Sequence, residues 1–202
     1  MSASDGSGRR NRDAEIVAAA IEVFSRKGYA AASVQDVADA VGLLKGSLYH
    51  YISSKEELLF RIFDESHRQG SAIIEEVSAL DLAPLERMHT YFERYVAWYL
   101  DNVERVSLYF KEWRYLQGER RATVIDQGRA YARFVRGLIE EAQAAGEVSP
   151  DVDPKLASFF IMGAVNAVPD WYHREGGEAA ATIARRYADM TVQVLTGTPP
   201  RG

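Results

Sequence analysis

One short segment, Lys45–Tyr51, concentrates side chains that can hydrogen-bond to a polar, anionic polymer. It combines a cation, hydroxyl groups, polar aromatics and one residue without a side chain: Lys45, Gly46, Ser47, Tyr49, His50 and Tyr51. Lysine and hydroxyl groups donate to phosphates and base edges, and a bare glycine lets a sugar–phosphate chain approach the backbone closely. Any one of these residues is explained by a polar surface, but the whole set favours contact with nucleic acid.

Two short helices joined by a glycine must position these side chains. Ser33-Val-Gln-Asp36 places a hydroxyl N-cap three residues before a carboxylate, which predicts a helix from there to Ala40. Gly42 then supplies a backbone conformation that other residues adopt only at a cost, and a second helix is expected over residues 44–51. This arrangement is typical of a helix-turn-helix.

A second capping box, Ser54-Lys-Glu-Glu57, opens a long helix that we expect to reach about Val77. Lys55 stands at its start, where the ammonium and the free N–H groups can together hold one phosphate. Most other segments also have helical spacing, and no run alternates as a strand does. The sequence therefore predicts an all-α fold of about nine helices, with an N-terminal three-helix helix-turn-helix domain and a larger helical domain.

Composition narrows the classes of protein. The chain of 202 residues has 47% apolar residues and no cysteine, which excludes disulfides and thiolate metal sites. The net charge is −5, but residues 1–55 carry +1, so a DNA-contacting N-terminus on an acidic body is allowed. We find no apolar run of about 18 residues and no secretory signal in Met1–Asn11. We expect a cytoplasmic protein with no membrane partner.

Residues 10–57 resemble the DNA-binding domain of TetR-type transcriptional regulators. The resemblance rests on a long series of fixed spacings: Ala19–Phe24 before Gly28-Tyr29, Ser33-Val-Gln-Asp-Val-Ala38, Val41-Gly42, Lys45-Gly-Ser-Leu-Tyr-His-Tyr51 and Ser54-Lys-Glu-Glu-Leu58. It implies that Lys45, Gly46 and Ser47 read bases in the major groove.

The same resemblance implies roles for the residues on either side. Ser33 and Gln35 fall where family members touch a phosphate or an outer base. Tyr49, His50 and Lys55 fall at positions that anchor the DNA backbone. The expected domains are a flexible tail at 1–11, a DNA-binding domain at 12–53, a ligand-binding and dimerisation domain at 54–197 and a tail at 198–202.

The later part of the chain resembles the TetR subgroup that regulates fatty-acid and sterol-ring degradation. Its landmarks are Gly146-Glu-Val148, Asp153-Pro154, Gly163–Asn166, Trp171-Tyr172 and Ala184–Tyr187. The resemblance implies a small-molecule effector, and several such regulators respond to acyl-CoA thioesters. Pro169 lies inside the last helix but one, so that helix should bend or end near residues 165–168.

An aromatic stripe between Tyr91 and Trp113 is the expected lining of the effector pocket, because large rings leave gaps that a ligand can fill. The candidate ligand-binding residues are Tyr95, Trp98, Tyr99, Phe110 and Trp113, with Arg114 and Asn166 as polar partners. Plain core or solvated surface remains the alternative for each of them.

Two C-terminal helices have apolar faces suited to packing between subunits. The candidate dimer residues are Phe159, Phe160 and Gly163 on one helix and Tyr187, Thr191 and Leu195 on the other. Two such helices from each subunit would form a four-helix interface. The alternative is that they close the core of the monomer.

We find no catalytic motif: Glu86-Arg-Met-His89 is one Glu-x-x-His pair where a di-iron site needs two. We therefore expect no enzyme, no metal site and no cofactor. The predicted function is a ligand-responsive DNA-binding regulator. As a homodimer it would be a repressor that a hydrophobic or acyl-CoA-like effector releases from a palindromic operator. The alternative is a helical dimeric interaction module without sequence-specific DNA binding.

Overall fold

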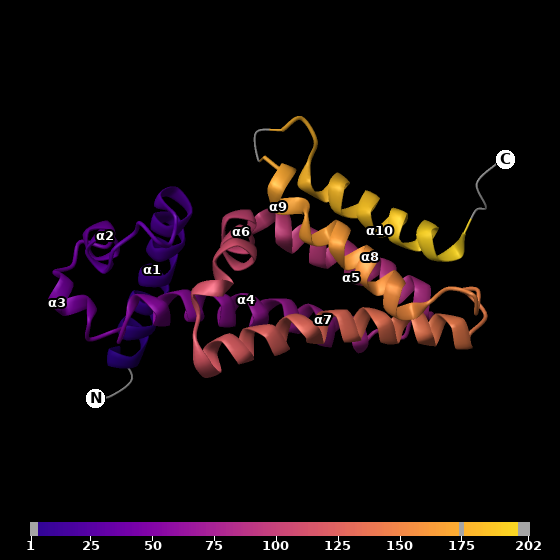
Figure 1. Ribbon diagram of the computed structural model, residues 1–202, viewed down its shortest axis with the longest axis horizontal. Helices are drawn as coiled ribbons and strands as arrows, with labels where there is room; N and C mark the ends of the chain where they lie inside the picture. The colour runs from indigo at the N-terminus through magenta and orange to yellow at the C-terminus, as the bar shows by residue number, and fades with distance from the viewer. Residues whose placement is uncertain (1–3, 174–175, 198–202) are drawn as a thin grey trace. The chain divides into compact units, whose positions relative to one another are not determined.

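A computed structural model describes residues 4–173 and 176–197, and their side chains from residue 11 onward. This part of the chain contains ten α-helices and one 3₁₀ turn and no strand, which confirms the expected all-α fold (Figure 1). The elements are α1 (Ser4–Lys27), α2 (Val34–Ala40), α3 (Lys45–Leu48), α4 (Lys55–Ser78), α5 (Pro84–Asp101), α6 (Val103–Glu112), η1 (Trp113–Tyr115), α7 (Gly118–Ala144), α8 (Pro154–Asn166), α9 (Val168–Trp171) and α10 (Ala180–Thr196). Within it, none of the helices combines the length and apolar character that a membrane crossing requires.

The first helix starts earlier than the sequence suggested. Residues 1–11 were expected to be a flexible tail, but α1 begins at Ser4. The segment has no proline and its two arginines favour helix, whereas Gly6 and Gly8 each disfavour it by about 1 kcal/mol, which is why the sequence alone indicated a tail. The remaining residues of the two expected tails, 1–3 and 198–202, lie outside the described residues.

The chain forms two compact units. Unit 1 contains the described residues up to Ser66 together with Glu104–Val124, and unit 2 contains His67–Val103 and the described residues from Ile125 onward. The division differs from the boundary expected between residues 53 and 54. The reason is that the hydrophobic cluster of unit 1 also takes in the first half of α4, Leu116 and Val124.

Unit 1 is built on a closed apolar core beneath α2 and α3. Ile16 and Phe24 of α1, Leu48 of α3 and Phe63 of α4 are all completely buried in one cluster. At about 25 cal/mol per Å² of apolar surface, each such side chain contributes roughly 2 kcal/mol of burial free energy. This core fixes the polar face of α3 on a rigid support.

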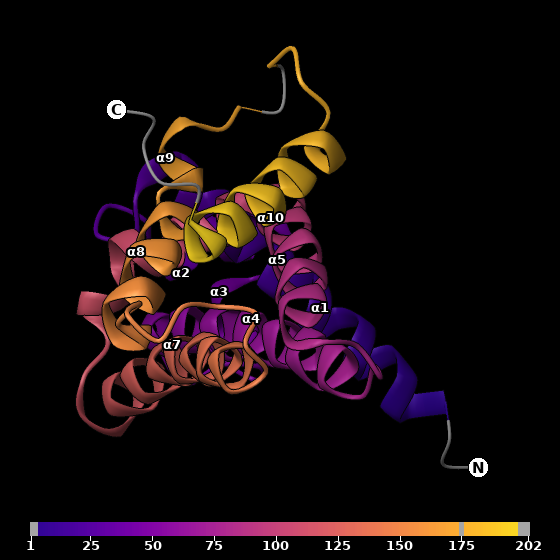
Figure 2. The same ribbon diagram turned by 90° about the vertical axis from the view of Figure 1, so that its right-hand side faces the viewer.

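Unit 2 is a helical bundle around α5. The stripe of buried residues on α5 is Met88, Tyr91, Phe92, Tyr95, Val96, Tyr99 and Leu100. In Figures 1 and 2, α10 lies beside α5 and α8. The bend predicted from Pro169 is confirmed, since α8 ends at Asn166 and α9 begins at Val168. Proline lacks an N–H donor and its ring collides with the carbonyl four residues earlier.

Candidate functional site

The capping box predicted at the start of α2 is present. The Asp36 N–H donates to Ser33 Oγ over 3.2 Å, and the Ser33 N–H donates to Asp36 Oδ2 over 2.8 Å. The Lys27 ammonium also donates to Asp36 Oδ1 over 2.5 Å. Lys27 first, and then the bonds from Ser33, lower the pKa of Asp36 to about 2. The first helix of the motif is therefore anchored at its beginning.

The two predicted contact residues of α2 are exposed but already have partners within the helix. The Ser33 hydroxyl donates to Asp36 Oδ2 over 2.8 Å, and the Gln35 amide donates to Asp39 Oδ1 over 2.6 Å. In this conformation both side chains stabilise α2. A contact with DNA would have to compete with these bonds.

The turn between α2 and α3 depends on a left-handed residue. Gly42 has φ +66°, a value that residues with a β-carbon rarely adopt. The following N–H, that of Leu43, donates to the carbonyl of Ala38 over 2.9 Å and so closes α2. Leu48 on α3 is completely buried, which orients the other side of α3 outward.

The second helix of the motif is shorter than the expected 44–51. Regular helix covers only Lys45–Leu48, and the chain then turns through Tyr51. The cause is a tightening of the hydrogen bonds, because the His50 N–H donates to Ser47 O and the Tyr51 N–H to Leu48 O, three residues back. Most of the predicted contact residues are still exposed: Lys45, Gly46, Tyr49 and His50 are exposed and Ser47 is partly exposed, whereas Tyr51 is partly buried against the core of unit 1.

Gly46 has no structural reason to be a glycine. Its φ is not positive, and a Cβ placed on it would meet no atom beyond its own helix within 4 Å. Glycine inside a helix costs about 1 kcal/mol relative to alanine. No contact in the described part of the chain recovers this cost.

Lys55 is placed differently from its predicted phosphate-holding position. Its ammonium donates to the carbonyls of Tyr29 and Ala32, both over 2.7 Å, and lies 4.3 Å from the centre of the Tyr29 ring. Burial lowers the pKa of Lys55. The N–H donors of Lys55 are therefore directed at backbone carbonyls of the loop after α1.

Two residues of this region were not predicted from the sequence. Arg61 donates to the Tyr51 carbonyl over 2.7 Å and so closes the turn after α3. No sequence signal points to this contact, because Arg61 lies beyond the motif. Leu44, the N-cap of α3, is 79% exposed and makes no capping bond. The sequence did contain a signal for Leu44, because N-cap positions favour Ser, Thr, Asp and Asn and a leucine at this position is unusual.

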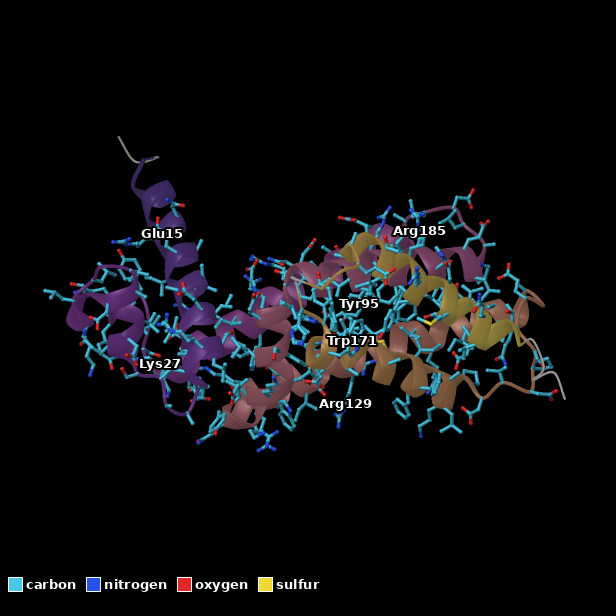
Figure 3. The ribbon with its side chains drawn as sticks, turned by 90° about the horizontal axis from the view of Figure 1, so that it is seen from above. Glu15, Lys27, Tyr95, Arg129, Trp171 and Arg185 are labelled. Carbon is cyan, nitrogen blue, oxygen red and sulfur yellow. The ribbon has the colours of Figure 1, made fainter. Side chains whose placement is uncertain are left out.

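Four of the seven predicted ligand-binding residues lie in unit 2: Tyr95, Trp98, Tyr99 and Asn166. Together with Tyr91 they form what we call the tyrosine cluster. The Tyr95 and Tyr99 hydroxyls lie 3.1 Å apart, and the Tyr99 hydroxyl donates to Asn166 Oδ1 over 3.2 Å. Trp98 Nε1 donates to Gln69 Oε1 of α4 over 3.0 Å. Figure 3 shows Tyr95 among crowded side chains, whereas Arg185 lies on the outer side of α10.

One polar atom of the tyrosine cluster has no partner in the described part of the chain. The hydroxyl of Tyr91, the first residue of the predicted aromatic stripe, is fully buried and makes no hydrogen bond there. Burial raises the pKa of Tyr91 and of Tyr95 well above the ordinary value, so both phenols are neutral. A buried hydroxyl without a partner costs about 1–3 kcal/mol, which a bound acceptor would offset.

The other three predicted ligand-binding residues belong to unit 1. Phe110 is partly buried, with its ring 5.2 Å from that of Tyr109. The Arg121 guanidinium lies over the Trp113 ring at 5.2 Å, and Arg114 is exposed. The predicted set is therefore not one cluster within one unit. The reason is that α6 and the turn after it pack against the core of unit 1, whereas α5 belongs to unit 2. Helical spacing along the sequence does not show this separation.

The predicted dimer residues also divide. Phe159, Phe160 and Gly163 are exposed on α8, with Phe159 at 55% and Phe160 at 65%. Thr191 and Leu195 are buried, so the prediction that they face another subunit is wrong. They lie on the side of α10 that packs against α5, whereas a neighbouring side exposes Met190 and Val194. Tyr187 is partly buried and stacks on Trp171 at 6.2 Å.

Comparisons with known proteins agree with this arrangement. Residues 16–62 match the family described as bacterial regulatory proteins, tetR family. Residues 81–195, more than half of the chain, match the family described as tetracyclin repressor-like, C-terminal domain. The chain belongs to the TetR family. This TetR-family protein is therefore a DNA-binding transcriptional regulator, and the resemblance expected from the sequence is confirmed.

Individual relatives cover nearly the whole of this TetR-family chain. It is 30% identical to the HTH-type transcriptional repressor KstR2 of Rhodococcus jostii, over 96% of this chain and 95% of that protein. Among solved structures, the TetR family transcriptional regulator PfmR of Thermus thermophilus has a TM-score of 0.82 and 28% identity, covering 88% of this chain and 97% of that one. AibR in complex with isovaleryl coenzyme A and operator DNA has a TM-score of 0.78 and 26% identity, covering 92% and 98%.

Proposed function

We propose that this TetR-family protein is a homodimeric repressor that leaves a palindromic operator when it binds a small effector. The observation behind the proposal is the outward face of residues 45–51 in unit 1. That face is polar, is held by the buried Leu48 and includes Gly46, whose exposed backbone has no internal reason to be bare.

The DNA contacts divide along this face. Lys45, Gly46 and Ser47 form the first turn of α3, the part of a recognition helix that meets base edges in the major groove. Tyr49, His50 and Tyr51 follow in the turn, where a hydroxyl or imidazole can donate to a phosphate. The first group sets sequence preference, and the second sets register and orientation.

Dimerisation is supported by the apolar residues that unit 2 leaves exposed. A contiguous apolar patch on a protein surface is typical of a protein–protein contact. The exposed large apolar residues of these helices are Leu156, Phe159 and Phe160 on α8 and Met190 and Val194 on α10, and α10 packs beside α8. A two-fold axis through such a patch presents two recognition helices to DNA. Half-sites one turn apart require a separation of about 34–36 Å.

The tyrosine cluster of unit 2 is the proposed effector site. Its rings offer apolar contact, and the unpartnered Tyr91 hydroxyl can donate to an acceptor on the ligand, such as a carbonyl oxygen. A thioester has both an apolar acyl chain and a carbonyl. The AibR structure contains isovaleryl coenzyme A, which supports an acyl-CoA-like effector here.

Helix α4 is the proposed route from effector to DNA. It is one continuous helix, with Gln69 bonded to Trp98 of the tyrosine cluster and Arg61 bonded to the end of the α3 turn. A displacement of α4 by the effector would move the support of the recognition helix. A near-complete switch requires about 5.5 kcal/mol of preference for one state, so the effector must discriminate strongly.

The test is DNA binding by the full-length protein at several salt concentrations, with duplexes selected from a random pool against unselected DNA. We expect a Kd of about 10⁻⁸–10⁻¹¹ M for selected duplexes and a steep fall in affinity with salt. Addition of isovaleryl-CoA and longer acyl-CoA thioesters tests release. If no duplex is preferred, the dimeric interaction module without sequence-specific DNA binding replaces this proposal.

A further inference from the structure

Lys55 lies at a junction of three segments of unit 1. It is the first residue of α4, and its ammonium donates to the Tyr29 and Ala32 carbonyls over 2.7 Å, with the Ala30 carbonyl at 3.5 Å. These carbonyls belong to the loop between the end of α1 and the N-cap of α2. The three N–H donors of a lysine ammonium are thus directed at three acceptors of one loop.

Tyr29, in the middle of that loop, connects the third segment. Its ring is buried under the Lys55 ammonium and lies 5.1 Å from the Tyr115 ring of η1. Its N–H donates to Glu112 Oε1 at the end of α6 over 3.3 Å. The loop that leads into α2 is therefore held between α4 and the α6–η1 segment, with the Lys55 ammonium at the centre.

We infer that Lys55 is a positioning residue for DNA binding, which holds the loop before α2 so that α2 and α3 keep their orientation on α4. It acts without touching a phosphate, because its donors are used inside the protein. The inference rests on DNA contact through α3, and it differs from the resemblance-based role in which Lys55 anchors the DNA backbone.

The discriminating measurement is the salt dependence of DNA binding. The logarithm of the DNA-binding constant falls linearly with the logarithm of the salt concentration, and each lysine–phosphate contact adds about 0.9 to the magnitude of this slope. Removing one such lysine from each subunit of a dimer therefore lowers the magnitude of the slope by about two. For Lys55→Met on a duplex selected by the wild-type protein, we expect Kd to rise at least tenfold with the slope unchanged. Lys45→Met, which removes an exposed lysine of α3, is the matched control for the loss of a lysine on the face proposed to meet DNA.

Two further readouts keep the inference testable if Lys55→Met folds poorly. Lys55→Arg would preserve a phosphate contact, because guanidinium binds phosphate well, but its planar fork does not fit a site built for an ammonium. We expect Lys55→Arg to weaken binding about as much as Lys55→Met. In the free protein, amide hydrogen exchange at residues 28–36 should become faster in both Lys55 variants and stay unchanged in Lys45→Met.

Two results would overturn the positioning role: a slope that falls by about two for Lys55→Met, or wild-type affinity for Lys55→Arg. The exchange measurement needs no DNA. It therefore separates failure of this inference from failure of the proposed function, in which the wild-type protein would select no duplex.

A second, independent observation concerns Leu44. An N-cap side chain normally accepts a hydrogen bond from the second or third helical N–H, which leucine cannot do. Leu44 nevertheless occupies the N-cap of α3, makes no such bond and is 79% exposed. The Leu44 side chain thus gives neither a cap to the helix nor burial to the core.

The position of Leu44 indicates which partner. It stands directly before Lys45 and Gly46, both exposed, at the end of α3 that meets base edges. The apolar feature of the major groove is the 5-methyl group of thymine. We propose that Leu44 contacts a thymine methyl and contributes to operator specificity, a role that rests on the proposed DNA contact through α3.

The test combines a protein change with a DNA change. Leu44→Ser creates a normal N-cap, so the midpoint of thermal unfolding should rise by about 2–4 °C while affinity for the selected duplex falls. Replacing thymine by uracil removes only the methyl group. At one position in each of the two half-sites it should weaken wild-type binding about fifteenfold and leave Leu44→Ser unaffected.

Two outcomes would overturn the role of Leu44. One is a duplex in which no uracil replacement weakens wild-type binding, and the other is Leu44→Ser with unchanged operator affinity. If the wild-type protein selects no duplex at all, it is the proposed function that fails. The stability gain from the new N-cap would still be measurable in that case.

Discussion

The two units of this protein distribute polar and apolar groups differently. In unit 1 the core is apolar and closed, and polar residues such as Lys45 and His50 face solvent. In unit 2 phenol groups such as that of Tyr91 are buried, while Phe159 and Phe160 are exposed. Unit 1 thus keeps its polar groups outside, whereas unit 2 has polar phenol groups in its interior and apolar rings on its exterior.

This difference indicates three kinds of partner. An exposed polar helix face with a bare glycine suits a charged polymer. An exposed apolar patch suits a second protein surface, and a buried hydroxyl without an acceptor suits a small ligand. In each case the predicted partner would make contacts with groups that lack such contacts in the described part of the chain. The following substitutions remove these features one at a time.

The largest effect is expected at the apolar exterior of unit 2. Phe160→Glu would place an unpaired carboxylate in each half of the proposed dimer interface, which costs several kcal/mol per ion. We expect the dissociation constant of the dimer to rise by about a thousandfold or more, measured by sedimentation velocity. Ala181→Glu, an exposed position on another side of α10, is the matched control and should remain dimeric. A dimeric Phe160→Glu variant would remove this patch from the interface.

The next effect separates folding from DNA binding in unit 1. Gly46→Ala should raise the free energy of unfolding by about 1 kcal/mol, because alanine favours helix and the new methyl has open space. It should also weaken operator binding by roughly tenfold, about 1.4 kcal/mol, because the methyl lies where DNA approaches. Gly137→Ala on α7 is the control, with equally open space, and should stabilise without changing DNA affinity. Unchanged affinity of Gly46→Ala would mean that DNA approaches elsewhere.

A smaller effect distinguishes two tyrosines of the polar interior of unit 2. Tyr99→Phe removes a hydroxyl bonded to Asn166, so the free energy of unfolding should fall by about 1–2 kcal/mol. Tyr91→Phe removes a hydroxyl that has no hydrogen-bond partner in the described part of the chain, and it should leave stability equal or slightly higher. Chemical denaturation measures both. A Tyr91→Phe variant that loses more than about 1 kcal/mol would show that its hydroxyl is already satisfied.

The smallest effect concerns the cap of α2. Since the folded pKa of Asp36 is about 2 and its ordinary value is 3.8, the stabilisation from its carboxylate is fully present above about pH 4. It is lost as the pH falls from 3.8 towards 2. A carbon-detected NMR titration of the Asp36 carboxyl should give the lowered pKa, and Lys27→Met should raise it. An Asp36 that titrates near 3.8 would contradict the capping arrangement.

The most reliable predictions came from local signals in the chain. The capping box at Ser33 depends on residues three apart, and the turn at Gly42 and the bend at Pro169 depend on single residues. Such features are fixed by backbone geometry within one or two turns. They located the outward face of α3 without any knowledge of the tertiary structure.

Predictions that depended on distant partners were less successful. The ammonium of Lys55 is bound by carbonyls 23 and 26 residues away, which have no side-chain signature in the sequence. The buried Leu195 and the exposed Val194 lie on neighbouring sides of one apolar helix, and periodicity alone does not say which side meets α5. Tertiary packing decides both cases.

The most direct test of the DNA-binding face is side-chain and amide footprinting of the full-length protein with and without its selected duplex. We predict that protection on binding is greatest at residues 44–51 of unit 1 and absent from the exposed stripe of α8. A duplex that binds specifically while residues 44–51 remain as reactive as in the free protein would contradict this prediction.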